Sequence, residues 1–556
     1  MTVDFSFLGK TFENWISQRP DTKLQSDHLI ASSYFIDLIR HKKKRTHFHK
    51  FIRKNLKSTH SNFWKKFLEA LFSEPAVSSL VLLELIFLLT ENKQLEGSLD
   101  TYLSLLGRRC EKFSADTEAN DIFHWLYTVN REYPNKARSF YALINKLLSP
   151  LKDIIHPKNP SRKHFVIAVN HIPCLPESIL RNSHLFVVYA FIEVLIEAYE
   201  GCRILLVFTG ENQRNSEFLQ HPNYKNPSLE DSRKYYGNSS SHFWEYLPKK
   251  CKESVEVFIP SSQTGTYNLY NSYQQIIEKI EAFNPCAIFT AGGVMEAKYI
   301  AQLYYKKRPT IFVPFNQNNQ LFAPYKGYLN YFKKEKLAID PIASDRKLFS
   351  HTKAVFIDPP EPILPKLGRY KKTDFVEGEK AFLLVTALTN NRTSKALKAH
   401  FKEKDLEQFA AIFDQHPNLH WLIFGEEEAS AITELHPKLH QLQKDKRLII
   451  RESESNLRGA YEHCKIYFNP FGAHGGGNGA RMAALEKCAV ITYSSSDLDI
   501  FTPQELIAPS LQNQLEILLS LIQSEEKLAD FQERCFHKTA NRNPKKFKEN
   551  LNTLLF

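Results

Sequence analysis

The sequence lacks any cysteine pattern that would hold a metal ion or a disulfide framework. Its eight cysteines are scattered over 556 residues, and no two of them form a CxxC pair. Zinc sites and small secreted disulfide scaffolds need closely spaced cysteines. We therefore expect reduced, buried thiols. No cluster of Asp and His has ligand spacing either, so we predict no catalytic metal.

Long apolar runs are also missing. The longest, LVLLELIFLL at 80–89, contains Glu84 and has about half the length that spans a bilayer. The N-terminal MTVDFSFLGK has neither the basic segment nor the apolar core of a signal peptide. We therefore expect a cytoplasmic protein in which 80–89 forms a buried helix.

Acidic residues are outnumbered, with 61 Asp and Glu against 73 Lys and Arg, which gives a formal charge of +12. The stretch 41–57, HKKKRTHFHKFIRKNLK, contains no acid at all. Such a surface attracts anionic partners. No recognisable nucleic-acid-binding motif accompanies it, so we expect no nucleic-acid partner. A solvated helix face and contact with an anionic membrane surface are the two interpretations left.

The hydrophobic pattern changes along the chain. In 1–155, apolar residues recur every three or four positions, which predicts an all-helical N-terminal domain. In 160–360, and again in 373–530, five strand-like runs alternate with helical stretches, which predicts parallel sheets with crossover helices. A Pro-rich segment, 357–372, separates them, and 531–556 reads as a helical tail. The predicted fold class is α/β: two Rossmann-like domains facing a cleft, behind a helical domain.

Glycine is scarce, yet NPFGAHGGGNGARMAALEKCAVITY at 469–493 holds four close together, at 475, 476, 477 and 479. A strand-like run precedes them and a helix-like run follows. Bare backbone at a helix N-terminus binds phosphate through free N–H groups and the helix dipole. The segment lacks the Lys-Ser/Thr of a Walker A loop and follows the fourth strand of its domain. This combination points to nucleotide-sugar glycosyltransferases of the GT-B type; a surface turn is the alternative.

Three stretches resemble glycosyltransferase family 41. They are LRGAYEHCKIYFNPFGAHGGGNGARMAALEKCAVIT (457–492), IEKIEAFNPCAIFTAGGVMEA (277–297) and ESILRNSHLFVVY (177–189). The family comprises the O-GlcNAc transferase catalytic core and cytoplasmic bacterial N-glycosyltransferases that modify adhesins. The resemblance implies a GT-B fold, a nucleotide-sugar donor such as a UDP-hexose, a polypeptide acceptor, no bound cofactor, and inversion at the anomeric carbon.

On the donor side, a leaving diphosphate in a metal-free enzyme needs a cation or a helix N-terminus. Arg392 is the first candidate and Lys395 the second, because both follow the first strand of the second domain; a solvated helix start is the alternative. Capping of a helix by Ser455 would explain the serines near 453 without any ligand. By resemblance, the remaining donor-binding candidates are His474, Gly475, Gly476, Gly477, Asn478 and Gly479 for the diphosphate, and Ser453, Ser455 and Leu457 for the base.

On the acceptor side, an inverting transferase needs a base or close positioning of the acceptor. His184 and His171 are both candidates for the base, because histidine titrates near neutral pH. Arg181 could bind phosphate or acceptor. A second glycine-bearing turn offers Gly292, Gly293 and Glu296 to a sugar or acceptor, although Glu296 would equally cap a helix.

Two positions depart from the family pattern. Arg481 stands where relatives have an acid that contacts the donor ribose, and Glu486 stands where they have a helix-end glycine. Two alternatives to a protein-modifying transferase therefore stay open. One is a GT-B enzyme that acts on a glycan or a lipid-linked saccharide, and the other is a scaffold without catalysis.

Overall fold

The computed structural model describes the two α/β regions in most detail. The described residues are 148–170, 183–209, 247, 249–258, 260, 269–291, 297–314, 325–330, 352–356, 370–377, 380–387, 403–425, 432–451, 456–470, 477–493, 498, 502–540 and 543–555, with single residues and pairs between 72 and 145. Every described residue from 72 to 145 is helical. Leu82, Leu83 and Ile86, in the apolar run, are fully buried. The basic stretch 41–57 lies outside the described residues.

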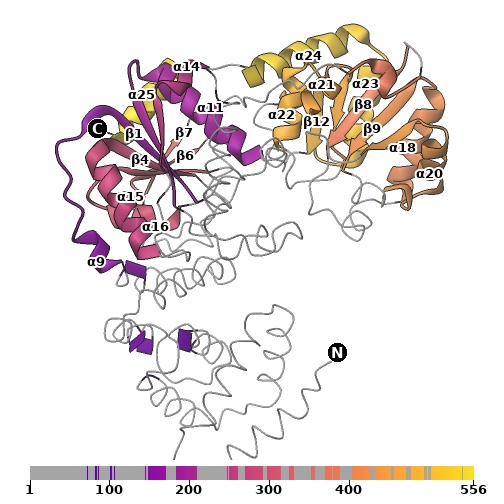
Figure 1. Cartoon of the computed structure of the whole chain (residues 1–556). Coiled ribbons are helices and arrows are strands. Elements are labelled where there is room, and N and C mark those ends of the chain that lie inside the picture. Colours follow the sequence, from indigo (N-terminus) through magenta and orange to yellow (C-terminus); the bar gives the residue numbers. More distant parts are fainter. Residues whose placement is uncertain are drawn as a thin grey trace, which may run out of the picture.

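A seven-stranded parallel sheet forms the first α/β region (Figure 1). Its strands are β1 (Ser161–Val169), β2 (Arg203–Phe208), β3 (Val255–Phe258), β4 (Pro285–Ala291), β5 (Thr310–Val313), β6 (Gly327–Asn330) and β7 (Lys353–Phe356). Their order across the sheet is β3-β2-β1-β4-β5-β6-β7. All seven residues of β4 are buried, as expected for a parallel strand covered on both faces.

A six-stranded parallel sheet forms the second region. Its strands are β8 (Phe382–Ala387), β9 (Leu419–Phe424), β10 (Leu448–Arg451), β11 (Ile466–Phe468), β12 (Ala489–Tyr493) and β13 (Ile507–Ala508). The order β10-β9-β8-β11-β12-β13 repeats that of the first sheet. The predicted pair of Rossmann-like domains is therefore confirmed, and the glycine-rich segment does follow the fourth strand of its sheet.

Three strands escaped prediction. The residues of β6, GYLN, carry a glycine and an asparagine, β7 is only four residues long, and β13 has two residues. Runs this short have no hydrophobic period to detect. They form because they extend the edge of a parallel sheet that already exists.

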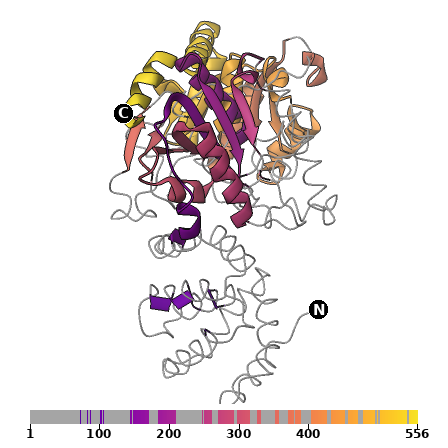
Figure 2. The ribbon, with the colours of Figure 1, turned by 60° about the vertical axis from the view of Figure 1, so that its left-hand side comes forward.

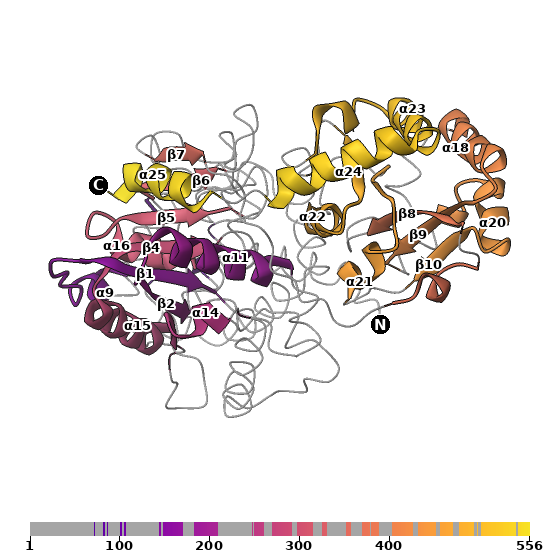
Figure 3. The ribbon, with the colours of Figure 1, turned by 90° about the horizontal axis from the view of Figure 1, so that it is seen from above.

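Helices cover both faces of each sheet (Figure 3). In α15, the buried Tyr273, Ile276, Ile277 and Ile280 recur every three or four residues and pack against the strands. On the first sheet, α11 (Ser183–Ala198), α14 (Lys249–Lys252) and α25 (Pro544–Leu555) lie on one face, and α15 (Leu269–Phe283) and α16 (Lys298–Tyr304), with α9 (Ser149–Lys152) beside them, on the other. On the second, α18 (Glu403–Gln415), α20 (Pro437–Lys444) and α23 (Leu511–Ile522) lie opposite α21 (Leu457–Tyr461), α22 (Gly477–Leu485) and α24 (Glu525–Ala540).

The last helix, α25, packs on the first sheet although it follows α24 of the second (Figures 1 and 2). Phe547 contacts the Phe191 ring of α11, with centroids 6.1 Å apart. Asn552 accepts a 2.9 Å hydrogen bond from the Tyr199 hydroxyl. Leu554 fills the space above Gly327, where an added Cβ would lie 2.5 Å from Leu554 Cδ2. The region expected to be a helical tail therefore supplies part of the first domain's core.

The described cysteines fit the prediction of buried thiols. Cys202, Cys251, Cys286, Cys464, Cys488 and Cys535 are all free and buried. Burial raises the pKa of Cys202 to about 11 and that of Cys286 and Cys535 to about 12. Among the described helices, none combines the length and apolar composition needed to cross a bilayer.

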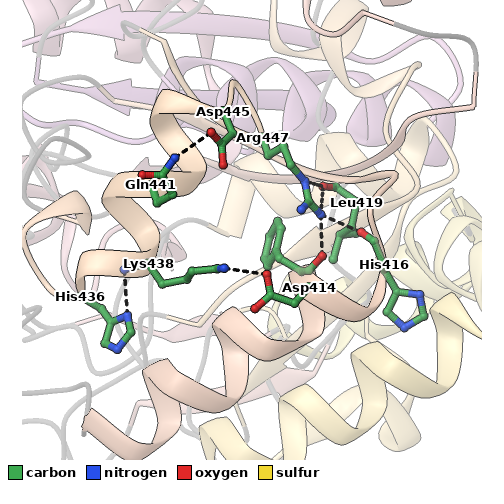
Figure 4. A network of polar contacts seen from close by, with 9 residues as sticks. Asp414, His416, Leu419, His436, Lys438, Gln441, Asp445 and Arg447 are labelled. Atoms are coloured by element: carbon green, nitrogen blue, oxygen red, sulfur yellow. Dashed lines mark hydrogen bonds and ion pairs between the residues drawn. The ribbon is translucent and has the colours of Figure 1, made fainter.

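Arg447 ties together the amino-terminal edge of the second sheet (Figure 4). Its guanidinium donates to the carbonyl oxygens of Phe413, His416 and Leu419, at 2.8, 2.7 and 3.1 Å from Nη2. Phe413 lies in the last turn of α18, where carbonyl groups have no partner within the helix. One planar side chain thus satisfies the end of α18 and the start of β9 together.

We expect Arg447→Met to lower the free energy of unfolding by about 2–3 kcal/mol, because carbonyl groups lose charge-assisted hydrogen bonds. Urea unfolding followed by circular dichroism measures the change. The matched control is Lys446→Gln, since the Lys446–Glu377 ion pair is 81% and 91% exposed and should contribute almost nothing. Equal stability of the two variants would contradict the assigned role.

Candidate functional site

The strand order of each sheet reverses at one place. In the first sheet this is between β1 and β4, and in the second between β8 and β11. In open parallel sheets, the connections leave two such neighbours toward opposite faces, which forms a crevice at the carboxyl ends of the strands. Ligands of open parallel sheets bind there. Topology therefore selects four loops, two in each sheet, as the candidate site.

In the second sheet, the two predicted phosphate-binding segments follow neighbouring strands. β11 pairs with β8, with Tyr467 opposite Val385. The segment of Arg392 and Lys395 leaves the end of β8, and the glycine-rich segment leaves the end of β11. Both ends lie at the same edge of the sheet. Arg392, Lys395, His474, Gly475 and Gly476 themselves lie outside the described residues.

The helix that follows the glycine segment begins where expected. Gly477 is the first residue of α22, Asn478 is the second and Gly479 the third. The Asn478 side chain lies outside the description, whereas Gly479 is buried. The free N–H groups of the first turn of α22 are thus at the carboxyl edge of the sheet, beside the end of β8.

Gly479 is required for close packing, a role that the sequence did not indicate. A Cβ added to it would lie 3.2 Å from Tyr467 Oη, 3.3 Å from Ala387 Cβ and 3.5 Å from Tyr461 Oη. The first turn of α22 therefore rests directly on the ends of β8 and β11. Contact of the Gly479 backbone with a diphosphate stays a prediction.

In the first sheet, the acceptor candidates follow the two strands at the equivalent reversal, β1 and β4. His171 and Arg181 follow β1 and lie outside the described residues. His184 is the second residue of α11, and its side chain is likewise outside the description. The other three candidates follow β4 and are also outside it: Gly292, Gly293 and Glu296. β1 pairs with β4, so both segments follow strand ends at the same edge of the sheet.

The base-side candidates need one correction. Ser453 and Ser455 lie outside the described residues, and Leu457 opens α21, half-buried against the core. The alternative interpretation, in which Ser455 caps the helix, is wrong. The cap is Asn456, whose side-chain oxygen accepts a hydrogen bond from Gly459 N at 3.3 Å. Asn456 folds so tightly over the first turn that a Cβ on Gly459 would lie 2.5 Å from its Nδ2.

Buried polar side chains mark the carboxyl ends of the strands, and sequence reasoning missed them. Trp421 Nε1 donates to Thr386 Oγ1 at 2.9 Å, and Thr386 Oγ1 donates to the Phe468 carbonyl at 2.5 Å. This relay connects the middle of β9 to the carboxyl ends of β8 and β11. The available signal was a polar residue at the end of an apolar run; the buried examples are Asn170, Thr209, Thr290, Thr386, Asn469 and Thr492.

Asn469 fixes the point from which the glycine segment leaves. Its Nδ2 donates to Thr492 Oγ1 at 3.3 Å, and its carbonyl accepts from Gln514 Nε2 of α23 at 3.0 Å. Asn469 is 3% exposed, and Gln514 is fully buried. Buried polar groups are expensive unless hydrogen-bonded, so these contacts hold the strand end in one position.

The structure places Arg481 and Glu486, the two positions that depart from the family pattern, in different surroundings. Arg481 lies inside α22 and is only 7% exposed, so it is part of the domain interior. Glu486 receives a 2.7 Å ion pair from Arg458 Nε, which ties the end of α22 to α21. The left-handed backbone position that favours glycine is the next residue, Lys487, with φ of 62°.

Among the described residues, no group of three or more His, Cys, Asp and Glu lies close enough to hold a metal ion. The candidate loops themselves are largely outside that part of the chain. Independence from metal stays a prediction.

Comparison with known proteins gives matches in fold only. No protein-family model and no curated protein sequence matches the chain. An O-GlcNAc transferase of Thermobaculum terrenum is 11% identical over 100% of this chain and 97% of its own, with a TM-score of 0.40. Anabaena HepE, solved with UDP and glucose, is 11% identical over 71% of this chain and 99% of its own, with a TM-score of 0.42. The pneumococcal O-GlcNAc transferase GtfA, solved with UDP and GlcNAc, is 14% identical over 52% of this chain and 60% of its own, with a TM-score of 0.35. These values assign neither activity nor residue roles.

The packing of Gly479 is testable through stability. Gly→Ala inside a helix normally stabilises by about 0.5–1 kcal/mol. We expect Gly479→Ala to show no such gain, because its Cβ meets the Tyr467 hydroxyl, and Gly479→Val to destabilise by about 1–3 kcal/mol through overpacking. Thermal unfolding of both variants measures this.

A double variant provides the control. Tyr467→Phe removes the hydroxyl that the new Cβ meets, so Gly479→Ala should be less harmful in that background than alone. Strict additivity of the two changes would show that Gly479 and Tyr467 do not restrict each other.

Proposed function

We propose that this protein is a GT-B glycosyltransferase that moves a hexose from a nucleotide-diphosphate sugar to an acceptor. One observation carries the proposal. The glycine-rich segment leads from β11 into the N-terminus of α22, at the point where the second parallel sheet reverses its strand order. Free N–H groups, a helix dipole and closely approaching backbone stabilise a diphosphate at such a place.

The leaving group of this reaction supports a role for Arg392. Breaking the bond between sugar and phosphate transfers negative charge to the diphosphate. A cation fixed beside that charge stabilises the transition state more than the ground state. Arg392 and Lys395 follow β8, and the glycine segment follows the neighbouring strand β11. We assign the diphosphate to this pair of segments, without a metal ion.

The acceptor belongs, in this proposal, to the crevice of the first sheet. A hydroxyl or amide acceptor loses a proton as it attacks the anomeric carbon, so a base beside it accelerates the reaction. His184 and His171 are the two candidates, with Arg181 between them in the sequence. The donor UDP, a polypeptide acceptor and inversion follow from the family 41 resemblance, and we propose them on that basis.

The test begins with ligand binding. Thermal-shift measurements with UDP, GDP, ADP and the corresponding sugar nucleotides should show stabilisation by one nucleoside diphosphate, since a ligand that binds only the folded state raises its stability. Co-expression with candidate acceptor polypeptides, followed by mass spectrometry, then identifies the modified side chain. Absence of binding and turnover across the whole panel would refute the proposal and favour a scaffold.

Arg392→Ala tests the assigned cation. We expect affinity for the nucleoside diphosphate to fall about ten- to hundredfold, because a charge-assisted contact to phosphate is lost. Isothermal titration calorimetry measures the affinity. Lys446→Gln, at the opposite edge of the same sheet, removes one positive charge without touching the crevice and should leave binding unchanged. Normal sugar-nucleotide turnover by Arg392→Ala would remove the role given to Arg392.

A further inference from the structure

Two tyrosine hydroxyls lie under the first turn of α22. Tyr461 is the last residue of α21, and Tyr467 is the middle residue of β11. Their rings stand edge to face, with centroids 6.1 Å apart and an interplanar angle of 87°. Both hydroxyls point to Gly479, within 3.2–3.5 Å of where its Cβ would lie. The first turn of α22 thus rests on two tyrosine hydroxyls.

The Tyr467 hydroxyl connects α22 to the other loop of the crevice. Its oxygen lies 3.4 Å from both the backbone N and the carbonyl O of Ala387, accepting from the first and donating to the second. Ala387 is the last residue of β8, where the segment of Arg392 begins. A shift of the Tyr467 side chain would therefore move the starts of both segments together.

The Tyr461 hydroxyl is in a different situation. Tyr461 is completely buried, and within the described part of the chain its Oη has no hydrogen-bond partner. Burial holds the pKa of Tyr461 well above its usual range, so the hydroxyl stays neutral. A buried hydroxyl without a partner destabilises the folded state. Phenylalanine would fill the same space without that penalty, so packing explains the ring and leaves the hydroxyl unexplained.

We propose that Tyr461 and Tyr467 are positioning residues that align the first turn of α22 with the diphosphate of the donor. In this arrangement the Tyr467 hydroxyl holds the first turn of α22 against the end of β8. The Tyr461 hydroxyl acquires its hydrogen bond when the first turn of α22 adjusts to the bound diphosphate. The inference rests on the proposed function, because it presupposes a diphosphate at this crevice.

Tyr461→Phe gives the decisive measurement. In the absence of nucleotide, we expect its melting temperature to equal or exceed that of the wild type, because a buried unpaired hydroxyl has been removed. Its affinity for UDP, measured by isothermal titration calorimetry, should nevertheless fall about three- to tenfold, the loss of one hydrogen bond. A purely structural role would not separate stability from affinity in this way.

Two further variants frame the result. Tyr467→Phe should lower both the melting temperature and the affinity for UDP, because its hydroxyl is bonded in the free protein. Tyr304→Phe is the matched control, since Tyr304 is a fully buried tyrosine of α16 at the amino-terminal side of the first sheet. It should leave the affinity for UDP unchanged.

The measurements distinguish failure of the positioning role from failure of the proposed function. Wild-type protein that binds UDP, with Tyr461→Phe binding equally well, overturns the positioning role and leaves the proposed function intact. Wild-type protein that binds no nucleoside diphosphate overturns both. Weaker binding that is accompanied by an equal loss of stability in Tyr461→Phe also overturns the inference, since damage to the fold then accounts for it.

Discussion

The right-handed crossover of parallel strands is the constraint on which the rest of this molecule depends. A chain that builds β8, β9 and β10 outward must return to the other side of β8 to add β11, and its helices then cover the opposite face. The return makes neighbours of two strands that are distant in sequence. In open parallel sheets, such a reversal forms a crevice at the carboxyl ends of the two strands, whatever their side chains. The first sheet repeats the same reversal at β1 and β4.

The sequence was sufficient for the strands that are long and apolar. A run such as AFLLVTAL is typical of a strand buried on both faces, and ten strand-like runs that alternate with helical stretches predict the α/β fold class. Local pattern could not reveal contacts that depend on the assembled sheets. The apolar side of α25 is visible in the sequence, but nothing in it says that Leu554 will meet Gly327 in the other domain.

Prediction of the site was limited for a related reason. The glycine cluster predicted a helix N-terminus at this place, and α22 does begin at Gly477, while phosphate binding there stays a prediction. A glycine that admits phosphate and one that admits a neighbouring strand look the same in sequence, and Gly479 meets Tyr467 and Ala387. Likewise, Ser455 and Asn456 are both good capping residues, and only the backbone geometry of α21 selects Asn456.

The return of α25 to the first sheet has a consequence for how the protein can be dissected. The first domain is discontinuous in sequence, since its strands end near 356 and its last helix begins at Pro544. A fragment cut within 357–372 would expose the faces of α11 and β7 that α25 covers, and the remaining fragment would carry an orphaned amphipathic helix. Separate production of the two domains therefore requires α25 to be grafted onto the end of the first. A fluorescent label at the C-terminus would report on the first sheet, although the preceding helix, α24, packs on the second.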